Sequence, residues 1–286
     1  MAAWRMAVQL ATLPEVERLS PACIRILGGN PGKFTLQGTN TYLVGTGASR
    51  LLVDTGEGKP SWAAALQRVL RDEKATVHAA LLTHWHHDHT QGVPDLRKLL
   101  PTVPIYKCDP AAEDGQSPIT DGQVFEVDGA TLTAVHTPGH TADHMAFVFR
   151  EEDALFTGDN VLGHGTAVFE DLGVYLQSLA KMESLVAGRA YPGHGPVLPA
   201  AHAKVAEYIA HRHQRELQVL EVLGSAAHVV DWSPMDLVKV IYADVPESLH
   251  LPAAHGVVQI LHKLQGEDRV TPGVEDKWRL KDKSAL

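Results

Sequence analysis

The chain of 286 residues is long enough for one large and one small domain, each with its own buried core. Apolar residues make up 44% and charged residues 21%, which is ordinary for a globular protein and argues against long disordered stretches. A formal net charge of −9 excludes nucleic-acid binding through bulk positive charge, although it leaves a local basic groove open. No apolar run approaches the roughly 20 residues that span a bilayer, so we expect no membrane association.

The first two thirds of the chain predict a layered α/β domain. Short apolar and β-branched runs indicate strands at 22–27, 40–54 (with a turn at 45–47), 77–82 and within 123–158. Helical periodicity indicates helices at 61–74, where Ser61 can be the N-cap, and then from Asp88 or His89 to Leu100. Further helices are expected at 172–186 and 200–223. Strands in a run that then alternate with helices are typical of a mixed sheet covered by helices.

From about residue 225 the sequence pattern changes to short helical segments followed by a β segment. Ser233-Pro234 is a favourable helix start, because the hydroxyl can cap the first turn and the proline lacks an N–H that would be free there anyway. A second helix over about 251–265 and a β segment from Val270 complete a small winged-helix-like module. We therefore expect an N-terminal segment at 1–20, a main domain at 21–222 and the module at 223–286. Cys23 and Cys108 are expected to be free thiols, although the sequence does not exclude a disulfide.

Five of the seven residues in the segment Thr83–His89 can bind a metal. His84 and His86 are two residues apart, so in an extended backbone their side chains point the same way. Asp88 and His89 enter the first turn of a helix and can address a second position. Imidazole and carboxylate groups together suit zinc, manganese or iron.

Three later segments supply further candidate ligands, namely His140, Asp159 and His194. Each follows a predicted strand and lies next to glycine, where the backbone can approach a site closely. Taken alone, each would more often be a turn or packing residue, but their joint occurrence after the histidine cluster is specific. His87 is then surplus and expected to be exposed, whereas Asp54 is expected either to orient a ligand imidazole or to cap a turn.

The series His-x-His-x-Asp-His, Pro-Gly-His-Thr, Thr-Gly-Asp and Gly-His resembles the ordered motifs of the metallo-β-lactamase superfamily over about residues 20–215. The resemblance implies a four-layer αββα sandwich, followed here by the small winged-helix-like domain, with two zinc ions at one edge of the sandwich. It also implies that one metal is held by His84, His86 and His140, that the other is held by Asp88, His89 and His194, and that Asp159 bridges them. Manganese or iron in place of zinc stays open.

Residues 36–44, the segment Phe169–Asp171 and the tail are similar to the β-lactamase-like protein 2 group of this superfamily. That resemblance implies an endoribonuclease that cleaves single-stranded RNA in the mitochondrial matrix. A cytoplasmic location is the alternative, since the N-terminus has a single arginine, Arg5, as a targeting signal. The basic residues of the tail would then either form an RNA-binding surface or be ordinary solvated charges. They are Arg212, Arg215, Lys239, Lys263, Arg269, Lys277, Arg279, Lys281 and Lys283.

The expected mechanism uses two divalent cations that share a water and lower its pKa, so that hydroxide attacks phosphorus or a carbonyl carbon. Asp88 is the expected catalytic residue, because it can accept a hydrogen bond from the hydroxide and orient it. His164 is a candidate substrate contact. His136 and His144 could orient a ligand or help donate a proton to a leaving group, but are expected mainly to pack.

Hydrolysis of a hydroxyacylglutathione-type thioester, a lactone or a β-lactam is the alternative reaction. A diiron flavoprotein reductase is disfavoured, because that relative carries glutamate where this chain has His86. A single-iron sulfur dioxygenase and a non-catalytic scaffold or nucleic-acid-binding module are more remote alternatives. The sequence leaves the oligomeric state, the metal and the RNA sequence preference open.

Overall fold

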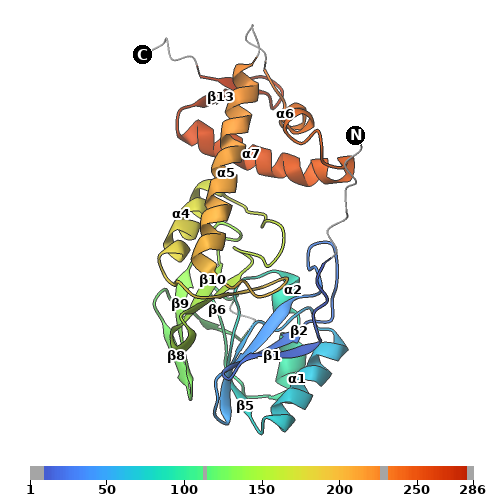
Figure 1. The fold of residues 1–286 in the computed structure, drawn as a ribbon, viewed down its shortest axis with the longest axis vertical. Coiled ribbons are helices and arrows are strands. Elements are labelled where there is room, and N and C mark those ends of the chain that lie inside the picture. Colours follow the sequence, from blue (N-terminus) through green and yellow to red (C-terminus); the bar gives the residue numbers. More distant parts are fainter. Residues whose placement is uncertain (1–9, 112–114, 226–230, 282–286) are drawn as a thin grey trace.

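The computed structural model describes residues 10–111, 115–225 and 231–281. Two β-sheets stack face to face, helices cover their outer faces, and a small C-terminal domain lies at one end of the molecule (Figure 1). The predicted four-layer αββα sandwich with a winged-helix domain is confirmed. Both cysteines are free thiols. Over the described ranges, no helix combines the length and the apolar character needed to cross a bilayer.

The first sheet has seven strands in chain order, and β4 and β5 are parallel neighbours at its centre. Its strands are β1 (Val16–Ser20), β2 (Cys23–Leu27), β3 (Asn40–Val44), β4 (Ser49–Val53), β5 (Thr76–Leu81), β6 (Ile105–Lys107) and β7 (Ser117–Pro118).

The second sheet has five strands in the order β12-β11-β10-β9-β8, antiparallel except for the parallel pair β11 and β12. Its strands are β8 (Val124–Val127), β9 (Ala130–His136), β10 (Met145–Phe149), β11 (Ala154–Gly158) and β12 (Ala190–Pro192).

Three apolar clusters lie between the four layers, one at each boundary between adjacent layers. Because successive side chains of a strand point to opposite faces, Leu43 packs outward on the helices α1 (Pro60–Asp72) and α3 (Val93–Leu99), whereas Tyr42 packs inward. The inner cluster joins the two sheets, and the ring of Phe156 of β11 lies 5.1 Å from that of Tyr42 across it. The third cluster lies on the outer face of the second sheet, under the helices α4 (Leu172–Glu183) and α5 (Ala201–Gly224).

The C-terminal domain consists of α6 (Pro234–Ile241), α7 (His250–Gly266) and the hairpin of β13 (Val270–Pro272) and β14 (Trp278–Leu280). Ser233 caps α6 in a capping box with Asp236, as its sequence predicts. Helix α5 extends from the sandwich into this domain, where it packs on α6, α7 and β14 (Figure 1). One apolar cluster therefore continues from the second sheet into the C-terminal domain.

The structure differs from the sequence predictions in the helix after the histidine cluster and in the cap of α1. Two short helices replace the single helix expected up to Leu100, namely α2 (His87–Thr90) and α3. Pro94 lies in the first turn of α3, because a proline inside a continuous helix would remove a hydrogen bond and clash with the preceding turn. The predicted cap Ser61 is wrong: α1 begins one residue earlier at Pro60, and its N-cap residue Lys59 makes no side-chain cap.

Residues 16–20, which the sequence assigned to the N-terminal segment, form the edge strand β1 of the first sheet. β1 pairs antiparallel with β2 alone, and its residues are only partly buried. Its sequence, Val-Glu-Arg-Leu-Ser, has no clear alternation of apolar and polar residues, so it gives little strand signal on its own.

Candidate metal centre

The candidate ligands all follow strands, and the three strands of the second sheet that carry them, β9, β11 and β12, run in the same direction. The segment His84–His89 follows β5, Asp159 follows β11, and His194 follows β12. His140 follows β9, which is parallel to β11 because both strands are antiparallel to β10. The carboxyl ends of these strands meet at one edge of the sandwich. The structure thus brings together all seven side chains that the sequence singled out, in the two predicted groups.

The first group contains His84, His86, His140 and Asp159, whose candidate ligand atoms all lie within 4.8 Å of one another. His84 Nε2 is 2.9 Å from His86 Nδ1, and His140 Nε2 is 3.3 Å and 3.1 Å from these two atoms. Nitrogens bound at about 2.0–2.1 Å to a tetrahedral cation would lie about 3.4 Å apart, close to this triangle. The first group therefore fits a single divalent cation.

The second group contains Asp88, His89 and His194. His194 Nε2 is 3.1 Å from Asp88 Oδ2 and 3.4 Å from His89 Nε2. Asp159 lies between the groups: its carboxylate oxygens are 3.2 Å from His194 Nε2, 3.4 Å from His89 Nε2 and 3.8 Å from His140 Nε2. Asp159 Oδ1 is buried and has no hydrogen-bond partner among the described residues. A free oxygen in that position fits a carboxylate that bridges two cations.

The pKa shifts indicate that positive charge is favoured at His194, in the second group, and disfavoured at His86, in the first group. Burial lowers the pKa of His194, but the carboxylates of Asp159 and Asp88 outweigh burial and raise it to about 9. Burial, reinforced by His140, instead lowers the pKa of His86 to about 4. Protons and metal ions compete for the same lone pairs. His86 is therefore already neutral for a metal at pH 7, and the acidic side of the centre attracts a cation in place of the proton on His194.

Asp54, which directly follows β4 and belongs to neither metal group, orients the imidazole of His89. Asp54 Oδ2 lies 2.7 Å from His89 Nδ1, and Thr83 N donates to Asp54 Oδ1 at 2.8 Å. A hydrogen bond on Nδ1 leaves His89 Nε2 free to bind a metal. Of the two roles expected for Asp54, this contact favours support of the candidate ligand His89.

We expect Asp54→Asn to weaken the binding of one of two zinc ions by about 10–100-fold, because the amide is a poorer acceptor for His89. Asparagine tolerates the positive φ of 60° at this position, so the fold should be kept. Zinc affinity is measured by competition with a chromophoric chelator. The exposed Asp72→Asn on α1 is the control, and equal affinities in the two variants would contradict the role of Asp54.

Sequence reasoning missed two groups that contact the candidate ligands, and for a third it preferred packing. The Val168 carbonyl accepts a hydrogen bond from His140 Nδ1 at 2.8 Å, and Thr39 Oγ1 donates to Asp88 Oδ2 at 3.2 Å. His144, expected mainly to pack, is fully buried, and its Nε2 accepts the Asp159 N–H at 3.2 Å. A carbonyl carries no side-chain signal, and a threonine or a third nearby histidine is too common to single out.

The remaining candidates lie outside both metal groups. His87 is exposed, as predicted. His164 is half-buried in the loop after β11, and its backbone passes close to Gly195, next to His194. Its contact with substrate stays a prediction.

Of the tail cations that could form a basic surface, four are paired with carboxylates. Lys263 pairs with Glu216 and Glu267, and Lys281 pairs with Asp268. Two further pairs join Arg269 to Glu267 and Arg279 to Asp231. Arg212 is not on the surface but buried, and Lys283 lies outside the described residues.

Two known protein families match this chain. The family described as "Metallo-beta-lactamase superfamily" matches residues 34–194, more than half of the chain, and that range contains all seven side chains. The chain belongs to the metallo-β-lactamase superfamily. A second family, described as "Beta-lactamase associated winged helix domain", matches residues 233–278. With its His and Asp cluster, the protein is a metal-dependent hydrolase of this superfamily.

Curated relatives cover nearly the whole chain. "Lactamase-like protein aptB" of Emericella nidulans is 48% identical and covers 94% of this chain and 90% of its own. "Atrochrysone carboxyl ACP thioesterase" of Aspergillus chevalieri is 46% identical, with coverages of 92% and 87%. A beta-lactamase domain protein from Burkholderia ambifaria has the same fold, with a TM-score of 0.79, 17% identity and coverages of 94% and 95%.

These relatives correct the preferred sequence prediction. Their names support the thioester alternative rather than cleavage of RNA, so the endoribonuclease, the RNA substrate and the nuclease group of the superfamily are not supported. The mitochondrial location followed from the same resemblance and stays only a prediction.

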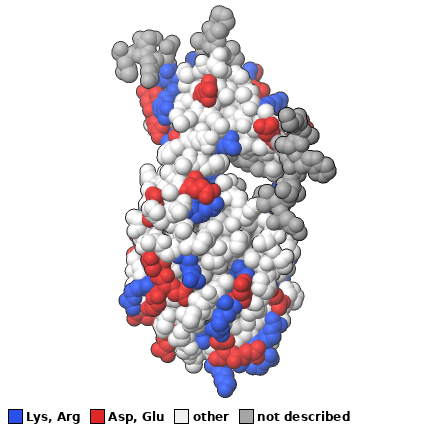
Figure 2. Space-filling model, in the orientation of Figure 1, with Lys and Arg blue, Asp and Glu red and all other residues white. Residues whose placement is uncertain are grey.

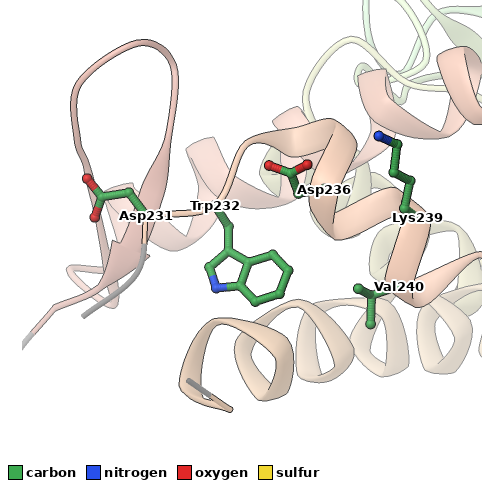
Figure 3. A pocket seen from close by; sticks show the side chains of 5 residues that line it. All are labelled: Asp231, Trp232, Asp236, Lys239 and Val240. Carbon is green, nitrogen blue, oxygen red and sulfur yellow. The ribbon is translucent and has the colours of Figure 1, made fainter. Parts of the chain in front are cut away.

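A hollow of about 390 Å³ lies in the C-terminal domain (Figure 3). It is lined by Asp231, Trp232, Asp236, Lys239 and Val240, none of which belongs to the metal centre.

Proposed function

We propose that the protein is a metal-dependent thioesterase that hydrolyses an acyl group from an acyl carrier protein. The observation that carries the proposal is the 46% identity, over nearly the full length of both chains, to the relative named as an atrochrysone carboxyl ACP thioesterase. A second relative of that name, from Paecilomyces divaricatus, is 52% identical over 217 residues. The reaction adds water to a thioester: the C–O bond forms, the C–S bond breaks, and a carboxylic acid and a thiol are released.

Exposed apolar side chains beside the metal groups support an acyl substrate. Trp85 lies between two candidate ligands, is 46% exposed, and its ring is 4.4 Å from that of His86. The Val168 side chain is 59% exposed, while its carbonyl binds His140. Phe34 is exposed in the loop that leads to Thr39, the residue that donates to Asp88. Apolar surface of this kind favours a hydrophobic acyl chain over a phosphate backbone.

Charge also favours the thioester. On the face drawn in Figure 2, basic and acidic side chains are interspersed and form no continuous basic track. Lys263, Arg269, Arg279 and Lys281 are paired with carboxylates, which reduces the positive charge that the tail offers for phosphate contacts. Nucleic-acid binding depends on such contacts for most of its affinity.

The residues of the two metal groups would bind the cations and position the attacking water for this reaction. His84, His86, His140 and Asp159 would hold one cation, and Asp88, His89, His194 and Asp159 a second. Bound divalent cations supply Lewis acidity, which acidifies water and polarises a carbonyl. Asp88 is partly exposed, and its Oδ2 is held by Thr39 and His194, so its carboxylate is positioned to accept a proton from an attacking water.

We expect the purified protein to release free thiol from an acyl-loaded carrier protein, and EDTA to abolish this release. The same acyl group on N-acetylcysteamine should react more slowly, because the binding energy of the carrier protein is lost. Single-stranded RNA, a glutathione thioester and a β-lactam are offered in parallel. Thiol is measured with a chromogenic disulfide reagent, and RNA is followed by gel electrophoresis.

His140→Ala, prepared in the same way, is the control for contaminating hydrolases. Chelator-sensitive cleavage of RNA without any thioester hydrolysis would reject the proposal and restore the endoribonuclease. Equal rates on the carrier-protein and glutathione thioesters would keep the thioesterase but reject the carrier protein as its partner.

A further inference from the structure

An arginine on α5, outside both metal groups, lies behind the backbone that binds His140. Arg212 is 8% exposed, and its Nη2 donates to the Ala167 carbonyl at 2.7 Å. Its guanidinium carbon lies 4.8 Å from the centre of the Phe169 ring and 5.7 Å from that of Tyr175. Within the described ranges it forms no ion pair with a carboxylate. A buried cation without an opposite charge is costly, so an apolar residue would be expected here if packing were its only role.

The segment that Arg212 contacts has little support of its own. From His164 to Phe169 the backbone makes no hydrogen bond to other backbone in the described structure. Side chains hold it instead: Tyr208 Oη donates to the Gly165 carbonyl at 2.9 Å, Arg212 binds the Ala167 carbonyl, and His140 binds the next carbonyl, that of Val168. The first regular backbone contact follows at Glu170, whose N–H donates to Gly139.

The Val168 carbonyl determines the state of a candidate ligand. It accepts a hydrogen bond from His140 Nδ1 at 2.8 Å, which places the ring proton on Nδ1 and leaves the lone pair on Nε2. His140 Nε2 then faces His84 Nε2 and His86 Nδ1 at 3.3 Å and 3.1 Å. If the Val168 carbonyl shifted, this hydrogen bond would be lost, and neither the tautomer nor the orientation of the His140 ring would be fixed by it.

Arg212 is itself fixed by the fold. Tyr208, Arg212 and Glu216 are four residues apart and lie on one buried face of α5. One turn beyond Arg212, Glu216 pairs with Lys263 of α7 at 2.8 Å, so the C-terminal domain holds the same face of the helix. The Arg212 guanidinium is therefore anchored on a helix that packs on both domains, and it contacts a segment, residues 164–169, that has no backbone–backbone hydrogen bonds in the described structure.

We propose that Arg212 is a positioning residue for the first metal group: by fixing the Ala167–Phe169 segment, it holds the Val168 carbonyl against His140 Nδ1. The inference rests on the metal role of His140 within the proposed function, but not on the identity of the substrate. Zinc binding therefore tests it separately from thioester hydrolysis. If the wild-type protein bound two zinc ions but hydrolysed no thioester, the proposed function would fail and this inference would still stand or fall on its own test.

The test compares Arg212→Met with Arg215→Met. Methionine keeps the length and the apolar contacts of Arg212 but removes the donor to Ala167. Arg215 is three residues further along α5 and stacks on Tyr242 of the C-terminal domain, 4.5 Å away, so the control loses an arginine–aromatic contact elsewhere. Zinc is titrated into the metal-free proteins in competition with a chromophoric chelator, and His140→Ala marks complete loss of the first group.

We expect Arg212→Met to weaken one of the two zinc ions by about 10–100-fold and to leave the other unchanged. In long-range ¹H–¹⁵N spectra of the histidine rings, His140 should change from a pure Nδ1–H tautomer to a mixture. Arg215→Met should match the wild type in both measurements. A folded Arg212→Met protein with wild-type affinity for both zinc ions and an unchanged His140 tautomer would overturn the proposal.

If Arg212→Met does not fold, Arg212→Lys decides the matter. Lysine keeps the charge but lacks the planar fork that both stacks on Phe169 and reaches Ala167. We expect it to fold and to bind one zinc ion more weakly than the wild type does, by less than His140→Ala. Unchanged binding of both ions in Arg212→Lys would overturn the proposal.

Discussion

Asp88→Asn should lower the rate of thioester hydrolysis by about 10²–10⁴-fold, the range typical of a lost general base, and should leave the fold intact. Asparagine has the same shape and can still accept from Thr39 Oγ1, which is 3.2 Å from the carboxylate. It removes the negative charge beside His194 and the group that accepts a proton from water. Initial rates at saturating zinc, together with circular dichroism, measure the two effects.

His87→Asn is the matched control for Asp88→Asn. His87 lies in the same short helix, is exposed, and belongs to neither metal group, so we expect the wild-type rate. Zinc analysis then assigns the loss: a variant that keeps two ions has lost the proton acceptor, whereas one that keeps a single ion has lost a ligand. A rate near the wild-type value in Asp88→Asn at saturating zinc would refute both roles.

Gly193→Ala should reduce activity by about 10²-fold, although it adds only one methyl group. A Cβ at this position would collide with Asp159 Oδ1 and lie 2.9 Å from His89 Cε1. The glycine backbone is fixed from both sides, since its N–H donates to Gly158 and its carbonyl accepts from Asn40. The methyl group must therefore displace the carboxylate that lies between the two metal groups, and zinc binding should weaken at both.

Gly256→Ala is the control for this substitution. Gly256 lies in α7, and a Cβ there would meet no atom within 4 Å. Alanine is the better helix former, so this variant should be fully active and at least as stable as the wild type. Normal zinc binding and normal rates in Gly193→Ala would show that the close approach of Gly193 to Asp159 is not required.

The seven candidate ligands could be predicted because their signals are local. Histidine and aspartate at strand ends, beside glycine, are visible in the sequence itself, and the His-x-His-x-Asp-His spacing already separates the two groups. The order of most strands and helices followed from periodicity in the same way, whereas the short strands β1, β6 and β7 were not predicted. The break between α2 and α3 also had a local cause in Pro94, although the sequence was predicted to form one continuous helix up to Leu100.

The substrate class could not be derived from these signals, because the same metal ligands serve several reactions on this fold. The RNA prediction depended on resemblance and on the winged-helix-like tail, whose basic residues could have formed an RNA-binding surface. In the fold, carboxylates that are distant in sequence take up several of those charges, as Glu216 does for Lys263, 47 residues further along the chain. Pairing of this kind depends on which helix faces meet.

The sequence alone therefore determined which side chains are the candidate ligands, since the type and the spacing of residues are local properties, and the resemblance of their motifs to the superfamily implied how they divide into two groups. Only the tertiary structure decided that Arg212 is buried, that it binds a carbonyl 45 residues away, and that the neighbouring Val168 carbonyl orients His140. Backbone carbonyls are identical in every residue. Their role depends on where packing between distant segments places them, which no local pattern records.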